Sequence, residues 1–190
     1  IVAVTTAPGV KSLPSNVRLY DVSDPANPLW VGAASLTKAI SEGTVNRISL
    51  RGNRVYAGSF RKGIQILDVE SMRSALEPCC SVGYFKAVSD LNLDQKGFNE
   101  EALIASIPVP GPSGQQSFFT GIKSIPQSAE PLIVATGNFG LALARESSPG
   151  GTVYRGMPSK DGETLQYGLA LDVATVEGYD IAVVAAISGA

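Results

Sequence analysis

One pattern of short strands joined by small turns occurs more than once in this chain, and it restricts the fold more than any other feature. Segment 16–22 reads Asn-Val-Arg-Leu-Tyr-Asp-Val, and segment 63–69 reads Gly-Ile-Gln-Ile-Leu-Asp-Val. Apolar side chains alternate in both segments, as they do in strands with one buried face. The two copies are separated by an interval in the range of roughly 40 to 50 residues that is typical of propeller blades. The repetition indicates an all-β repeat protein.

A second kind of strand, rich in small and β-branched residues, begins near four positions: Ile1, Arg54, Leu132 and Asp180. The intervals are roughly 50, 80 and 50 residues, which fits β-propeller blades of which one carries an insertion. We therefore expect residues 1–190 to form a single, partial domain, a β-propeller segment of about three blades of antiparallel strands. A β-sandwich built from similar strands is the alternative fold.

The insertion is expected at about residues 81–117. It contains two stretches, 87–93 and 100–104, that could form one or two helical turns, followed by a run rich in proline and glycine. Such a run predicts an exposed connection. Prolines and glycines also cluster in segment 146–162, where we expect a further long loop.

Both ends of the chain have the character of strands, since it begins with Ile1-Val2-Ala3-Val4 and segment 181–186 reads Ile-Ala-Val-Val-Ala-Ala. Edge strands carry unpaired amides and carbonyls. We therefore expect both segments to pair with further blades of the same protein or with a partner chain. The blade cores are expected to contain Val17, Leu19, Ile48, Leu50, Val55, Ile64, Ile66, Leu67, Ile133, Val134, Leu141, Leu143, Val173, Ile181 and Val183.

The composition excludes several classes of function. The chain contains no histidine, so serine–histidine–acid triads, cysteine–histidine dyads and histidine-ligated metal sites cannot be built from it alone. With 17% charged residues and a formal charge of −2, binding of nucleic acid is not expected. No apolar run approaches the roughly 18 residues that cross a bilayer, so no membrane insertion is expected. No cofactor or metal site is predicted, and no acidic pair stands out as a glycosidase site.

The most specific string of the sequence begins at Asp21 and reads Asp-Val-Ser-Asp-Pro-Ala-Asn-Pro-Leu-Trp-Val-Gly. It resembles the LVIVD-type repeat of bacterial and archaeal surface proteins, in which a strand ends in a DVSDP turn and another strand follows. The resemblance covers residues 16–32 and 45–72, although segment 68–72 lacks the second aspartate and the proline. It implies a β-propeller in a large secreted or cell-surface protein, with no enzymatic activity attached to the repeat.

The physical chemistry of this turn favours a structural role. Asp21 and Asp24 can accept hydrogen bonds from backbone amides two or three residues later, and Pro25 fixes φ. Pro28 begins the next strand, where its missing donor does no harm. Interleaved prolines and the lack of an EF-hand glycine argue against the alternative, a calcium loop formed by Asp21, Ser23, Asp24 and Asn27.

The adjacent pair Cys79 and Cys80 has three interpretations. The two residues could form a vicinal disulfide in a strained eight-membered ring, lie as small apolar residues on opposite faces of a strand, or bind a soft metal with help from elsewhere. Pro78 and segment 81–83 suggest a turn, which tolerates a distorted peptide better than a strand does. An extracellular location would favour the disulfide.

Two hairpin turns at matching repeat positions, segments 59–63 and 137–140, each place an aromatic residue among polar neighbours. They supply the residues of a candidate binding rim for a protein or glycan ligand: Phe60, Arg61, Lys62, Asn138 and Phe139. In the alternative interpretation the turns are purely structural, with glycine at positive φ and phenylalanine covering the hairpin.

The sequence therefore predicts a noncatalytic binding or assembly module, located outside the cell or at its surface. The alternative is the propeller domain of a hydrolase or oxidoreductase, which would require acidic or aromatic side chains to converge on a central channel. The lack of histidine favours the noncatalytic interpretation.

Overall fold

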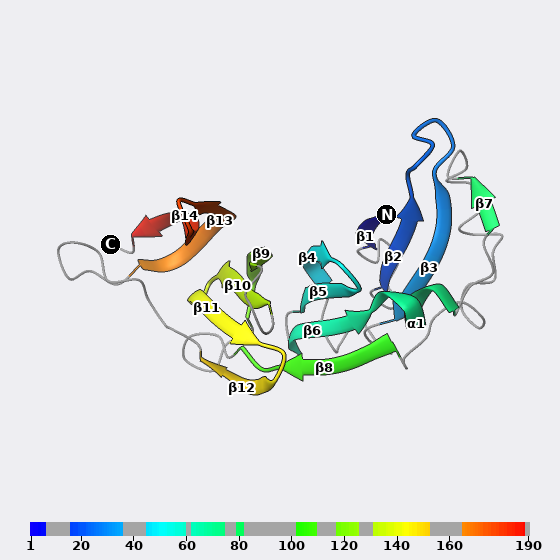
Figure 1. Cartoon of the computed structure of the whole chain (residues 1–190). Helices are drawn as coiled ribbons and strands as arrows, with labels where there is room; N and C mark the ends of the chain where they lie inside the picture. Colours follow the sequence, from blue (N-terminus) through cyan, green and yellow to red (C-terminus); the bar gives the residue numbers. More distant parts are fainter. Residues whose placement is uncertain are drawn as a thin grey trace.

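The computed structural model describes residues 1–6, 16–35, 45–59, 62–74, 79–81, 102–109, 117–125, 131–152 and 165–188. The described strands form four antiparallel sheets that follow one another along an arc (Figure 1). The all-β class and the antiparallel pairing that the sequence predicts are therefore confirmed. We call these sheets blades 1 to 4 in chain order.

The first two blades each contain four described strands. Blade 1 has the spatial order β1 (Val2–Thr6), β2 (Asn16–Asp21), β3 (Leu29–Ser35) and β7 (Cys79–Ser81). Blade 2 has the order β4 (Val45–Arg51), β5 (Arg54–Ser59), β6 (Gly63–Asp68) and β8 (Leu103–Ile107). The short helix α1 (Val69–Ser74) follows β6 directly.

The last two blades differ in size. Blade 3 has the order β9 (Phe119–Ile125), β10 (Leu132–Gly137), β11 (Gly140–Arg145) and β12 (Ser148–Thr152). Blade 4 is a two-stranded hairpin of β13 (Leu165–Val176) and β14 (Tyr179–Ser188). The described strands thus form three four-stranded antiparallel sheets and one hairpin, an arrangement compatible with the expected segment of about three blades.

Successive blades pack face to face through three separate cores. The first core joins blades 1 and 2 and contains Leu19 and Val55, the second joins blades 2 and 3 and contains Ile66 and Ile133, and the third joins blades 3 and 4 around Leu171. Strands β4, β9 and β13 contact one another in turn. They lie on the inner side of the arc, whereas β8 and β12 lie on its outer side (Figure 1). Repeated face-to-face packing of this kind is the arrangement of propeller blades.

Two expectations about the connections are wrong in part. The helical turn expected over 100–104 does not extend to its last residues, because β8 begins at Leu103 and pairs with β6, with Ile107 opposite Ile64. The loop expected over 146–162 contains β12, which pairs with β11. Both strands complete the outer edge of a blade by backbone pairing. The local composition of the segments does not reveal such pairing.

Helix α1 stands where the second repeat departs from the DVSDP string. Asp68 accepts a hydrogen bond from the Ser71 amide at 2.8 Å, which is the contact of a helix N-cap. Met72 is fully buried in the core between blades 1 and 2. A Cβ atom added to Gly32 of β3 would lie 2.7 Å from the carbonyl oxygen of Met72, so glycine allows this close approach. The second repeat thus lacks the proline of the DVSDP string and forms at this place a helix that packs on the neighbouring blade.

Most of the apolar residues expected in the cores are buried or pack against a core. In blade 4, however, Ile181 and Val183 are 42% and 65% exposed, and Ala182 and Val184 face blade 3 in their place. The other expected residues are buried (Val17, Leu19, Val55, Ile64, Ile66, Leu67, Ile133 and Val134) or partly buried (Ile48, Leu50, Leu141, Leu143 and Val173).

The position of a turn explains the error in blade 4. Gly52 is the first residue of the two-residue turn before β5, whereas Gly178 is the second residue of the turn before β14. Matching these two glycines, as the repeat pattern suggests, shifts β14 by one residue. A shift of one residue exchanges the two faces of a strand.

Candidate interaction surfaces

The candidate binding rim lies on the turns between β5 and β6 and between β10 and β11. Phe60 and Arg61 lie outside the described residues. Lys62 is exposed, and it is followed by Gly63 with a φ of +74°. Gly140 ends the second turn with a φ of +82°. Glycine therefore supplies the left-handed backbone in both turns, as the structural interpretation requires.

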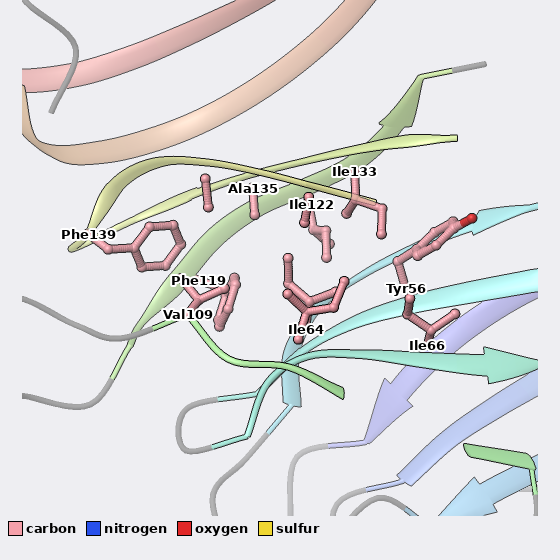
Figure 2. Packing of buried hydrophobic residues seen from close by; sticks show 12 residues of the cluster. Tyr56, Ile64, Ile66, Val109, Phe119, Ile122, Ile133, Ala135 and Phe139 are labelled. Atoms are coloured by element: carbon pink, nitrogen blue, oxygen red, sulfur yellow. The ribbon is translucent and has the colours of Figure 1, made fainter. Parts of the chain in front are cut away.

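The two rim residues of the second turn serve the fold. Phe139 is buried, and its ring packs edge-on against Phe119 with centroids 5.0 Å apart and an interplanar angle of 62° (Figure 2). The side-chain oxygen of Asn138 accepts a hydrogen bond from the Phe118 backbone amide at 2.7 Å. The backbone amide of Asn138 donates to the Phe118 carbonyl at 3.1 Å. Phe139 thus belongs to the core between blades 2 and 3, which corrects its assignment as a surface ligand contact.

The turn after β2 is held by its two aspartates. Asp21 accepts hydrogen bonds from the Ser23 hydroxyl at 2.5 Å and the Ser23 amide at 2.9 Å, and both contacts lower its pKa below 3.8. Asp24 accepts from the Asn27 side chain at 2.9 Å and the Ala26 amide at 3.0 Å, and these lower its pKa in the same way. The carboxylates thus make the turn hydrogen bonds that the structural interpretation predicts.

Replacing Asp24 with alanine is expected to lower the melting temperature by a few degrees at about pH 7, because the turn loses two hydrogen bonds. Since the folded pKa of Asp24 lies below 3.8, this stabilisation is present above pH 3.8 and is lost as the pH falls toward the folded pKa. The difference between wild type and variant should therefore shrink in acid, which calorimetry can follow. A melting temperature that rises by many degrees in millimolar calcium would contradict the structural interpretation.

A polar bridge joins blades 2 and 3 at the start of β5. Arg54 donates to Asp68 at 2.6 Å within blade 2 and to Glu146 at 3.3 Å in the turn between β11 and β12. Asn53 also donates to Asp68, at 2.9 Å. The Ser71 amide and, to a lesser degree, Arg54 lower the pKa of Asp68. Asp68, the last residue of β6, therefore caps helix α1 and, through Arg54, anchors a contact between blades.

The inner strands of successive blades are also linked by polar side chains. Arg47 and Arg51 of β4 donate to the carbonyls of Thr120 and Ser124 in β9, at 2.7 and 3.0 Å. Thr120 in turn donates to the Gly168 carbonyl of β13 at 2.5 Å. Strands β4, β9 and β13 are edge strands of their sheets. Arg47 and Arg51 therefore act as structural links between blades 2 and 3.

The backbone of Cys79 and Cys80 belongs to β7, which pairs with the outer edge of β3 opposite Leu29 and Trp30. The pair therefore lies on a short strand and not in the expected turn. Their side chains lie outside the described part of the structure. The vicinal disulfide, the two opposed thiols and the soft-metal site all remain predictions from the sequence.

Both end blades carry exposed apolar residues, but only blade 4 presents an open apolar face, because Arg18 and Trp30 on the corresponding face of blade 1 are buried. On blade 4, the face away from blade 3 contains Val176, Tyr179, Ile181 and Val183, with exposed fractions of 49%, 74%, 42% and 65%. On blade 1, Val2 and Val4 are each 42% exposed on the face away from blade 2. The alternation of apolar residues in β14 is visible in the sequence, but the strand register that turns these side chains away from blade 3 is not.

No family model, no curated protein and no solved structure matches this chain. Within the parts of the chain that the structure describes, no three His, Cys, Asp or Glu side chains group as metal ligands. No helix among the described residues is long and apolar enough to cross a membrane. The exposed apolar face of blade 4 is the candidate functional surface.

Proposed function

We propose that this chain is a noncatalytic binding and assembly module of an extracellular or cell-surface protein, which holds other protein elements on the open apolar face of blade 4. The resemblance of residues 16–32 to the LVIVD-type repeat supports this class of protein and this location. The extended polar links between inner strands suit a scaffold, since they fix the blades relative to one another.

The proposal rests on the face of blade 4 that points away from blade 3. Counted from the turn, Ile181 is the third residue of β14 and Tyr56 is the third residue of β5. Tyr56 is fully buried by blade 3, whereas Ile181 is 42% exposed. A position that is a core position in one blade is thus a surface position in another. Contiguous exposed apolar faces mark protein–protein contacts in folded proteins.

The test compares association of the wild type with that of the double variant Ile181→Lys/Val183→Lys by sedimentation velocity at micromolar concentration. We expect the wild type to associate and the variant to remain at the monomer mass of 19.7 kDa, because two charges would be buried in the contact. The matched control is Leu103→Lys/Ile104→Lys, which changes exposed apolar residues of β8 that lie at neither end face.

The control should associate like the wild type. A wild type that is a stable, cooperatively folding monomer at micromolar concentration would overturn the proposal. Equal loss of association in both variants would show that general surface apolarity, and not the end face, causes the association. Far-UV circular dichroism confirms that each variant retains its strands.

A further inference from the structure

We propose that the free edge of strand β14 is a binding site for an extended strand of a partner protein, which adds to blade 4 as an antiparallel third strand. This inference rests on the proposed function and names the kind of protein element that blade 4 holds. The site consists of the backbone edge of the hairpin and the part of blade 3 beside it, and it is separate from the outer apolar face of blade 4.

The hydrogen-bonding edge of β14 is open among the described strands. In blades 1 to 3 the second strand, which is β2, β5 or β10, pairs with a strand on each side. Within the described part of the chain β14 pairs with β13 alone, although β14 is 10 residues long. The backbone groups of β14 that point away from β13 are thus available. An edge of this kind is a template for an added strand.

The contact between blades 2 and 3 shows what a four-stranded neighbour covers. Ile66 of β6 and Ile107 of β8, the third and fourth strands of blade 2, are both fully buried in the second core. Ala142 and Ala144 of β11, the third strand of blade 3, belong to the same core. The third strand of one blade therefore takes part in covering the outer strands of the blade before it.

The face of blade 3 toward blade 4 is well covered only in its inner part. Ile125 of β9 and Val134 of β10 belong to the third core and are 4% and 0% exposed. Leu141 and Leu143 of β11 pack against the same core but are only partly buried. Blade 4 has two described strands where blade 3 has four. A third strand beside β14 would extend the cover over β11.

The open edge and the partly covered leucines together define the chemistry of the partner. Its backbone is extended and runs antiparallel to β14, as β6 does to β5 and β11 to β10. The third strands β3, β6 and β11 contain 7, 6 and 6 residues, so a segment of this length fills the position. Every second side chain of the added strand points toward blade 3 and meets Leu141 and Leu143. The partner therefore presents a short strand with apolar residues at alternate positions.

The probe is a fluorescently labelled synthetic peptide with the sequence Lys-Val-Thr-Val-Thr-Val-Lys. Fluorescence anisotropy should show saturable binding to the wild-type chain. Two derivatives carry backbone N-methyl groups either at the valines or at the threonines. Because successive amides of a strand point to opposite edges, one derivative should keep its affinity and the other should bind at least about tenfold more weakly. Bound peptide should also slow hydrogen exchange at alternate amides of β14.

A pair of variants locates the site on the chain. Leu141→Lys/Leu143→Lys should weaken binding of the peptide at least about tenfold, because the peptide valines would then face two charges. The matched control is Leu103→Lys/Ile104→Lys, which adds the same charges to exposed residues of β8. This control should bind the peptide like the wild type.

Several outcomes would overturn the strand-addition site. Absence of saturable binding to the wild type is one, and equal binding of both N-methyl derivatives is another, because a peptide on the outer apolar face would not depend on one backbone edge. If the wild type associates without peptide and its β14 amides then exchange more slowly, a second copy occupies the edge and the assigned partner is wrong.

Failure of the proposed function is recognised separately, because sedimentation velocity without peptide measures it. If Leu141→Lys/Leu143→Lys loses its circular-dichroism signal, the two N-methyl derivatives decide the question with the wild type alone.

Discussion

Replacing Phe119 with alanine is expected to lower the free energy of unfolding by about 3–5 kcal/mol. Phe119 is fully buried in the core between blades 2 and 3, where its ring packs against Phe139 (Figure 2). A Cβ atom added to Gly58 would lie 2.6 Å from the Phe119 ring, so the ring fills the space that this glycine leaves. Truncation therefore opens a cavity at the contact between two blades. Urea unfolding followed by circular dichroism measures the loss.

The matched control is Leu103→Ala, which shortens a side chain that is 40% exposed on β8 and should cost well under about 1 kcal/mol. A double-mutant cycle of Phe119→Ala with Phe139→Ala isolates the ring pair, whose coupling should be about 0.5–1.5 kcal/mol. If Phe119→Ala cost no more than the control, blades 2 and 3 would not share this core.

Replacing Gly63 with alanine is expected to be similarly damaging, for a different physical reason. The φ of +74° places this residue in the left-handed region, which costs an alanine about 1–2 kcal/mol. Its Cβ would also run into the carbonyl oxygen of Ile107 and would lie 2.8 Å from the Val109 amide, and both are backbone atoms that cannot rotate away. Overpacking of this kind adds about 1–3 kcal/mol.

Gly52 separates the two contributions to the cost at Gly63. It has a φ of +52°, and a Cβ atom there meets nothing within 4 Å. Gly52→Ala should therefore show only the conformational cost of about 1–2 kcal/mol. The difference between the two alanine variants measures the close approach of the β5–β6 turn to the strand β8. Equal losses in thermal unfolding would contradict that approach.

The repeated strands could be predicted because their signal is local. Residues 16–21 and 63–68 show apolar alternation and both form strands, although the structure buries both faces of β6 from Gly63 to Leu67. The turn after β2 is local as well, since Asp24 hydrogen-bonds to residues two and three positions away. The second repeat could be recognised as a variant of the first, but the helix that replaces its turn depends on burial of Met72 against blade 1.

The candidate rim could not be judged from the sequence. A hairpin turn predicts that Phe139 is near the surface, but Phe119 of β9 in the same blade lies beside it, and packing against blade 2 buries both rings. Whether an aromatic residue in a turn faces solvent depends on what packs against the turn. The sequence contains no local signal for a neighbour that begins some twenty residues earlier in the chain.

The sequence by itself determined the all-β class and the structural chemistry of the Asp21 turn, because strand alternation and turn hydrogen bonds involve residues close together in the chain. Only the tertiary structure decided that β8 and β12 complete the outer edges of their blades and that Ile181 and Val183 face outward. Strand pairing between distant segments depends on which backbone edge is left open. Which face of a strand is buried depends on its register, and a shift of one residue at a turn exchanges the two faces.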